Sequence, residues 1–138
     1  MPDKNLIFKK LAEILKQLKY LKKLSALSEK ILISEETQMY LAERVMERLI
    51  GAALDINMHI AADLTNEVPE DYFSSFFALA KLKIYPISFA KKIAPSASLR
   101  NILVHEYQDI NIKKFRAAIK KALVDYSKYA KYIKEFLK

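Results

Sequence analysis

The residues of this chain best suited to chemistry lie close together, in the segment RNILVHEY that spans residues 100–107. On a helix, which turns by about 100° per residue, Asn101 and His105 share one face, so the Asn101 amide is placed to fix the tautomer and orientation of the imidazole. Arg100 and Tyr107 share another face, and Arg100 lies about 140° around the axis from His105. The spacing therefore predicts a polar strip of Asn101 and His105, with Arg100 and Tyr107 on its flank.

This set of side chains suits cleavage of RNA without a metal ion. Histidine, with an unperturbed pKa of about 6.5, can take a proton from a ribose 2′-hydroxyl and return one later. Arginine is a permanent cation whose planar donor fork fits phosphate oxygens and the extra charge of a pentacoordinate transition state. DNA lacks the 2′-hydroxyl and would not be cut in this way. On the residues alone, His105 can equally be an ordinary packed or surface histidine.

His59, the other histidine of the chain, has Asp55 and Asp63 one helical turn to either side. This arrangement is compatible with a metal site, but structural hydrogen bonds are its commoner use. With two His and no Cys, a zinc site made of protein ligands alone is poorly supplied. We therefore predict no bound metal and no cofactor.

The composition favours a helical protein. The chain has 138 residues, of which 52% are hydrophobic, and it contains one Gly and four Pro. Such a chain can bury a sizeable core, and it has few residues for the tight turns of a sheet protein. The absence of Cys removes any need for an oxidising compartment. We predict an all-α protein that folds as one domain over residues 1–138 and is cytoplasmic.

Lysines interrupt the apolar residues near the N-terminus, so no signal peptide is expected. No stretch approaches the roughly 20 apolar residues of a membrane-spanning helix, so no membrane association is predicted. The formal net charge is +8. Lysines gather before residue 31 and after residue 111, and together they could form a basic face for a polyanion or a plain solvated surface. Both interpretations remain open.

Apolar residues at three- and four-residue steps predict long amphipathic helices. The pattern covers residues 5–29, 35–64, 71–82 and 112–136. Pro86 and Pro95 predict a short helical piece over residues 86–92 and a new helical start that leads into the motif. Four long helices with short connections indicate an antiparallel four-helix bundle, with an extra short helical piece before the motif helix.

The second expected helix is apolar over a broad arc, which predicts a central position in the bundle. Ser34 is its expected N-cap, with Glu35 and Glu36 in the first turn. Three polar residues on this helix could contact the motif or a dimer mate, or form ordinary salt bridges: Arg44, Arg48 and Asp55.

Three tyrosines on the last expected helix alternate with lysines. They are Tyr126, Tyr129 and Tyr132, interleaved with Lys128, Lys131 and Lys134. Such a pattern could stack and clamp single-stranded RNA, although its three-residue step is equally that of a packed helix face. We favour core packing for Tyr126 and Tyr129 and leave Tyr132 open.

The segment from Arg100 to Tyr107 resembles the signature of HepT-like HEPN toxins, which is Arg, four residues, His, one residue, Tyr. Residues 43–60 and 71–82 are similar to the second and third helices of that family, and the likeness covers roughly residues 35–115 in order and spacing. The sequence departs from the common pattern over residues 94–99, just before Arg100.

This resemblance implies a HEPN-type helical bundle that forms a homodimer, with the two Arg-His motifs meeting in a composite RNA-cutting site. It implies an endoribonuclease toxin in which Arg100 binds phosphate, His105 is the acid or base and Asn101 orients it. It also implies a minimal nucleotidyltransferase (MNT) antitoxin that transfers AMP to Tyr107. The alternatives are a non-catalytic helical partner that presents substrate to a nucleotidyltransferase, and a purely structural bundle.

Overall fold

The computed structural model describes residues 2–105 and 111–138, and at Val104 and His105 it describes the backbone alone. This part of the chain is all-helical and contains no strand. Its helices are α1 (Lys4–Ser25), α2 (Glu29–Ser34), α3 (Glu36–Thr65), α4 (Tyr72–Lys81), α5 (Ile87–Ile93), α6 (Ser96–His105) and α7 (Ile112–Phe136). The predicted all-α class is confirmed, including the short helix before the motif helix and the bounds of the last helix.

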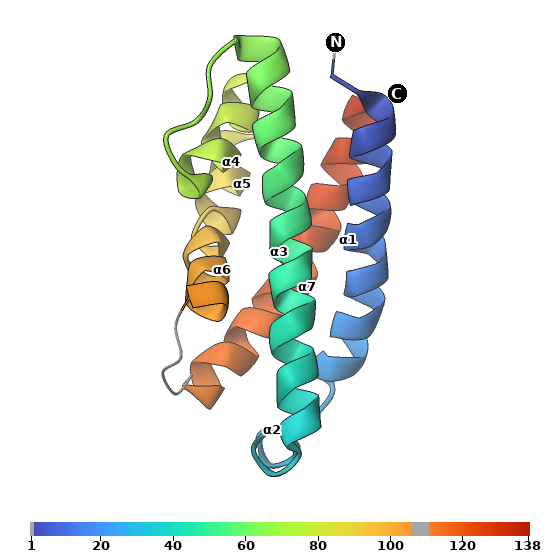
Figure 1. Ribbon diagram of the computed structural model, residues 1–138, viewed down its shortest axis with the longest axis vertical. Helices are drawn as coiled ribbons and strands as arrows, with labels where there is room; N and C mark the ends of the chain where they lie inside the picture. The colour runs from blue at the N-terminus through green and yellow to red at the C-terminus, as the bar shows by residue number, and fades with distance from the viewer. Residues whose placement is uncertain (1, 106–110) are drawn as a thin grey trace.

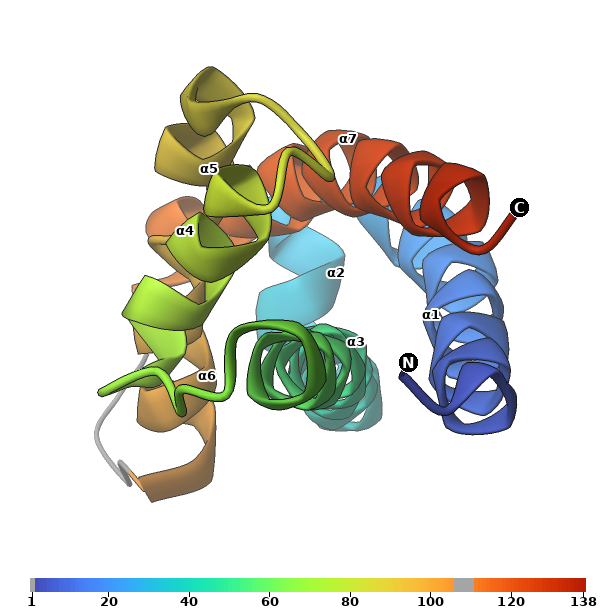
Figure 2. The same cartoon turned by 90° about the horizontal axis from the view of Figure 1, so that it is seen from above.

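Helix α3 occupies the middle of the bundle, as predicted. It contacts α1 on one side and α4 and α6 on the other, while α7 crosses behind it and packs against α1 (Figure 1). Seen from above, α1, α3 and α7 surround a common interior, and α4, α5 and α6 form a separate group beside α3 and α7 (Figure 2). Helix α3 therefore connects the long terminal helices to the group that carries the motif.

The predicted N-cap of the central helix is wrong. Ser34 is the last residue of the short helix α2, and α3 follows Glu35, whose side chain makes no capping hydrogen bond. The first helix also ends earlier than predicted, at Ser25, because Ser28 caps a new helix by accepting a hydrogen bond from the Ile31 N–H. The apolar spacing of the sequence does not reveal the break between α1 and α2, because Leu32 of α2 is also buried. Helix α2 packs against α3 and α7.

The core of the motif-bearing side is aromatic. Tyr126 and Tyr129 of α7 are fully buried, which confirms the prediction that these rings pack in the core. The centroid of the Tyr129 ring lies 6.2 Å from that of Phe76 and 6.3 Å from that of Tyr85. Tyr132 is half-buried, with its ring 5.1 Å from that of Phe89. These rings stabilise the contact of α7 with α4 and α5.

Candidate active site around Arg100

Arg100 is half-buried on α6, at the contact of this helix with α3 and α4. Its guanidinium carbon lies 5.4 Å from the centroid of the Tyr72 ring, in the range of a cation–π interaction. Tyr72 is the first residue of α4. Sequence reasoning missed Tyr72 because it is far from the motif along the chain, and the fold alone brings the two together.

The start of α4 is fixed by Asp71. Its carboxylate accepts hydrogen bonds from the backbone N–H of Ser74 at 2.7 Å and from the Ser74 hydroxyl at 2.6 Å. These two hydrogen bonds favour the charged carboxylate and lower the pKa of Asp71. The N-cap therefore holds the first turn of α4, and with it the Tyr72 ring, against Arg100.

Arg100 also borders a groove of about 480 Å³ between α1, α3 and α6. The groove is lined by Leu6, Lys9, Lys10, Glu13, Glu47, Arg48, Gly51, Ala52, Asp55 and Arg100. The structure thus brings Arg48 and Asp55 to the same groove as Arg100, as the sequence allowed. Arg44 is exposed and does not line the groove, and it pairs with Glu47 at 3.1 Å.

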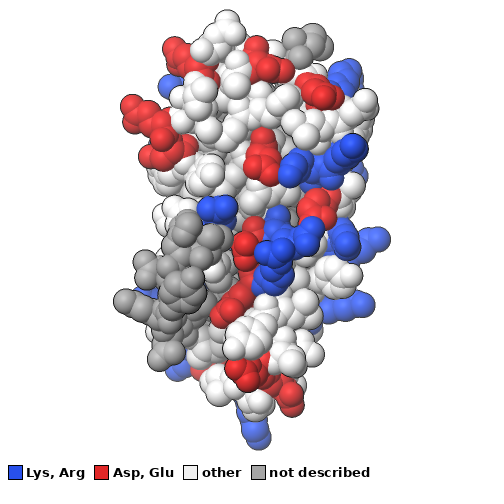
Figure 3. Space-filling view, in the orientation of Figure 1, with Lys and Arg blue, Asp and Glu red and all other residues white. Residues whose placement is uncertain are grey.

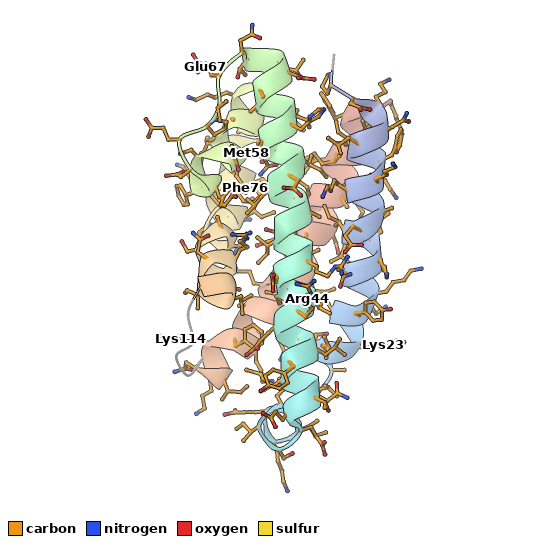
Figure 4. The ribbon with its side chains drawn as sticks, viewed as in Figure 1. Lys23, Arg44, Met58, Glu67, Phe76 and Lys114 are labelled. Atoms are coloured by element: carbon orange, nitrogen blue, oxygen red, sulfur yellow. The ribbon has the colours of Figure 1, made fainter. Side chains whose placement is uncertain are left out.

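The charges of this groove are paired with one another. Arg48 Nε lies 2.5 Å from a carboxylate oxygen of Glu13, and Lys10 Nζ lies 2.7 Å from one of Asp55. Burial raises the pKa of Glu13, but the hydrogen bond and charge of Arg48 outweigh it, so that this pKa is lowered. Figure 3 shows the result, since blue and red side chains interleave over α1 and the middle of α3. In Figure 4, Arg44 marks the level of α3 at which this mixed surface lies.

Gly51 forms part of the floor of the groove. It is the single glycine of the chain and sits inside the 30-residue helix α3. A Cβ added at this position would meet no atom within 4 Å. Glycine weakens the interior of a helix. Within the described part of the chain, however, no neighbouring atom requires a glycine at this position.

The remaining motif residues are only partly described. Asn101 is exposed on α6, and Ile102 beside it is 44% exposed. His105 is the last residue of α6, with its backbone alone described, and Tyr107 lies outside the described residues. The predicted pairing of Asn101 with His105 thus stays a prediction.

The beginning of α6 is tied to α7 by a partly buried hydrogen bond. The hydroxyls of Ser96 and Tyr126 lie 2.6 Å apart, and the Ser96 hydroxyl also donates to the Ile93 carbonyl. Lys121 of α7 donates to the Lys92 carbonyl at the end of α5. These contacts set where the motif helix begins, and Pro95 was the one residue that indicated this start in advance.

His59 has a structural partner. Its Nε2 accepts a hydrogen bond from the Asp3 backbone N–H at 3.0 Å, and Asp63 lies 3.8 Å from the same nitrogen. Within residues 2–105 and 111–138, no group of three His, Asp or Glu side chains is placed to hold a metal ion. His59 therefore ties the segment before α1 to α3.

Among the helices of the described residues, none combines the length and the apolar character needed to cross a membrane.

An all-helical bundle with an Arg-x4-His segment on its sixth helix has the architecture of a HEPN protein. The family model described as ribonuclease HepT-like matches residues 14–133, and the chain belongs to this family. It is 38% identical over 120 residues to the tRNA nuclease HepT of Aphanizomenon flos-aquae, covering 87% of this chain and 82% of that one. It is 27% identical over 89 residues to the mRNA nuclease HepT of Shewanella oneidensis, covering 64% and 67%.

Solved structures share the fold. The tri-AMPylated HEPN toxin of Shewanella oneidensis in complex with its MNT antitoxin superposes with a TM-score of 0.83 at 24% identity, covering 98% of this chain and 99% of that one. The cytosolic protein of unknown function YutE from Bacillus subtilis gives a TM-score of 0.84 at 20% identity, covering 99% and 91%. At such identities the likeness establishes the HEPN fold.

Proposed function

We propose that this protein is a metal-independent endoribonuclease toxin that cuts RNA with Arg100 and His105. The observation that carries the proposal is the position of Arg100, which is held beside Tyr72 at the edge of an open groove, in a chain of the ribonuclease HepT-like family. The name of the Aphanizomenon relative supports tRNA as a substrate, and that of the Shewanella relative supports mRNA.

In the proposed reaction, His105 takes the proton of a ribose 2′-hydroxyl as the oxygen attacks the adjacent phosphorus. The bond from phosphorus to the 5′-oxygen breaks, and the imidazolium formed in the first step returns its proton to this leaving oxygen. The products are a 2′,3′-cyclic phosphate and a 5′-hydroxyl end. Arg100 binds the phosphate oxygens and stabilises the added charge of the transition state, while Asn101 orients the imidazole.

The active form in this proposal is a homodimer of HEPN domains. Arg100 and His105 diverge by about 140° on one helix, so a single subunit offers half of a site, which a twofold mate can complete. The groove beside Arg100 supports a protein mate, because its mixture of paired cations and carboxylates is a poor surface for a polyanion. At Gly51 the α3 backbone is bare, which allows another helix to approach closely.

The proposed regulation is the transfer of AMP to Tyr107 by an MNT antitoxin. The Shewanella HEPN toxin, solved as a tri-AMPylated protein with its MNT antitoxin, supports this assignment. AMP on Tyr107 would place a bulky, negatively charged phosphate beside Arg100 and His105 and neutralise the anion site.

The decisive experiment compares purified wild type, His105→Ala and Arg100→Ala on tRNA and mRNA in the presence of EDTA. We expect the wild type alone to cleave and to leave cyclic phosphate ends. If EDTA abolishes cleavage, or if His105→Ala cuts as fast as the wild type, the proposed mechanism is wrong. A wild-type dimer that leaves every RNA intact would instead favour the non-catalytic partner.

A second experiment expresses the same variants in cells without an antitoxin. We expect the wild type to arrest growth and His105→Ala to permit it. Equal growth of the two strains would contradict the toxin function.

A further inference from the structure

The outward face of α7 is rich in lysine. Its exposed lysines are Lys113, Lys114, Lys120, Lys121, Lys128, Lys131 and Lys134. The two carboxylates of this helix are Asp125, which is buried, and Glu135, which pairs with Lys138. We call these seven lysines the α7 lysine strip. The buried residues of α7 occupy the opposite face, so that the strip points to solvent along the whole helix.

Within residues 2–105 and 111–138, one lysine of the strip has a carboxylate partner. Lys121 pairs with Asp125 at 2.5 Å and donates to the Lys92 carbonyl. For the other six lysines, the part of the chain that the structure describes offers no carboxylate within 4 Å. Their charges are therefore open to an external anion.

The α7 lysine strip differs from the groove surface between α1 and α3, where Arg48 pairs with Glu13 and Lys10 with Asp55. Outside the groove, Lys16, Lys19 and Lys22 of α1 are exposed and likewise have no carboxylate within 4 Å among the described residues. On α7, Lys128, Lys131 and Lys134 follow one another at three-residue steps, where like charges repel and weaken the helix. A surface on which positive charge predominates suits a partner of opposite sign.

The strip begins near the motif and leads away from it. Helix α7 starts at Ile112, seven residues after His105, and Lys114 lies in its first turn, at the lower left of Figure 4. From Lys113 to Lys131 the strip extends about 27 Å at 1.5 Å per residue. Figure 2 shows α7 along the side of the bundle opposite α3, and the groove at Gly51 is lined by residues of α1, α3 and α6. A partner on the strip can therefore reach the motif without covering that groove.

We infer that the α7 lysine strip binds the phosphate backbone of the RNA substrate, away from the bond that is cut. The inference rests on the proposed ribonuclease function for the nature of the polyanion. Lysine ammonium groups contact phosphates as point charges, so that this binding is independent of base sequence and weakens as salt is raised. The strip thus supplies affinity, while the motif supplies the chemistry.

The test measures the affinity of His105→Ala protein for bulk tRNA, so that binding does not depend on cleavage. In this background, Lys120, Lys128 and Lys131 are all replaced by Gln. The control replaces three exposed lysines of other helices by Gln, Lys30, Lys81 and Lys91, with the same change of net charge. Circular dichroism confirms that both variants are folded.

We expect the strip variant to bind tRNA about tenfold more weakly or worse at physiological salt, and the control to change less than twofold. The slope of log affinity against log salt should fall by about two to three in the strip variant, since each lost phosphate contact contributes about 0.7–0.9. In protein with His105 intact, the strip substitutions should raise KM and leave kcat unchanged.

Three results would overturn the inference. They are unchanged tRNA affinity in the strip variant, an equal loss in the control, and preferential binding of polyglutamate, which would indicate an acidic protein partner. These outcomes are separate from those of the proposed function. If the protein binds tRNA through the strip but never cleaves it, the inference about the strip holds and the proposed ribonuclease function is wrong.

Discussion

The guanidinium of Arg100 lies over the ring of Tyr72, 5.4 Å from its centroid, across the contact between α6 and α4. The ring is itself held in place, because Asp71 caps the helix that Tyr72 begins. An arginine side chain has many rotamers, and an aromatic face beside the cation reduces their number before any substrate arrives. Tyr72 is therefore a positioning residue for the phosphate-binding group of the proposed site.

Replacing Tyr72 by Leu should lower kcat/KM for RNA roughly 2- to 5-fold, which corresponds to the 0.5–1 kcal/mol of an exposed cation–π interaction. Phe at this position keeps the ring face and should restore most of the activity. The measurement is single-turnover cleavage of a labelled tRNA by the three proteins.

Phe73→Leu is the matched control. Phe73 neighbours Tyr72 in the sequence and is 45% exposed, but its ring packs against Phe77 at 5.3 Å between centroids. It should cleave like the wild type. An equal loss in Phe73→Leu, or no rescue by Tyr72→Phe, would mean that the ring does not act through Arg100.

Gly51→Ala should stabilise the folded subunit. The new Cβ enters open space, and alanine is about 0.5–1 kcal/mol better than glycine inside a helix, which raises Tm by a few degrees. If a second copy approaches the bare backbone here, the same change should weaken the dimer and the cleavage activity. Thermal unfolding and sedimentation equilibrium measure the two effects.

Ala62→Gly, on the exposed surface of the same helix, gives the reverse change as a control. It should lower stability by a similar amount without weakening the dimer. A Gly51→Ala protein that is more stable and still fully dimeric and active would remove the support that Gly51 gives to the dimer.

Much of the fold could be predicted from apolar spacing. The pattern placed α3 in the centre and predicted the bounds of α7, because long amphipathic helices repeat their apolar positions many times. It failed between Ser25 and Glu36, where α2 continues the same pattern in a new direction. There the serine at 28 is the cap and the serine at 34 is not, and local preference cannot distinguish them.

The candidate site was less accessible to sequence reasoning. The motif singled out Arg100, and the polar residues Arg44, Arg48 and Asp55 on an apolar helix left contact with the motif and ordinary salt bridges as alternatives. The structure shows ion pairs for all three, and the partners of Arg48 and Asp55 come from α1. The contacts of Tyr72 with Arg100 and of Ser96 with Tyr126 join segments far apart along the chain. Such contacts depend on how the helices pack, and no local spacing contains that information.

Tyr129→Phe should destabilise the fold by about 1–3 kcal/mol. The Tyr129 hydroxyl donates to Asn57 Oδ1 at 2.6 Å and also contacts the Ala53 carbonyl, and its loss leaves a fully buried amide oxygen without that donor. Urea unfolding measures the change. Adding Asn57→Leu together with Ser75→Ala should recover part of it, because Asn57 Nδ2 donates to the buried Ser75 hydroxyl and apolar replacement of all three partners removes the unsatisfied groups. Tyr20→Phe, at an exposed position of α1, should change stability by less than about 0.5 kcal/mol.

Alkaline pH should unfold this protein through its buried tyrosines. Burial raises the pKa of Tyr85, Tyr126 and Tyr129 above the ordinary value of about 10, because the phenolate is disfavoured in the core. When the pKa of a group is higher in the folded state than in the unfolded state, its contribution to stability is fully present at pH values below the unfolded-state pKa. This stability is lost as the pH rises above about 10, at about 1.4 kcal/mol per pH unit for each group.

Tyrosinate absorbance from these buried rings should therefore appear together with the loss of helical circular dichroism. Tyr126→Phe should reduce the dependence of unfolding free energy on pH by about 1.4 kcal/mol per pH unit. Ser96→Ala, which removes the partner of the Tyr126 hydroxyl and leaves the phenol buried, should keep that dependence. Ionisation of the buried tyrosines while the helices remain intact would contradict the prediction, because a phenolate would then be tolerated in the core.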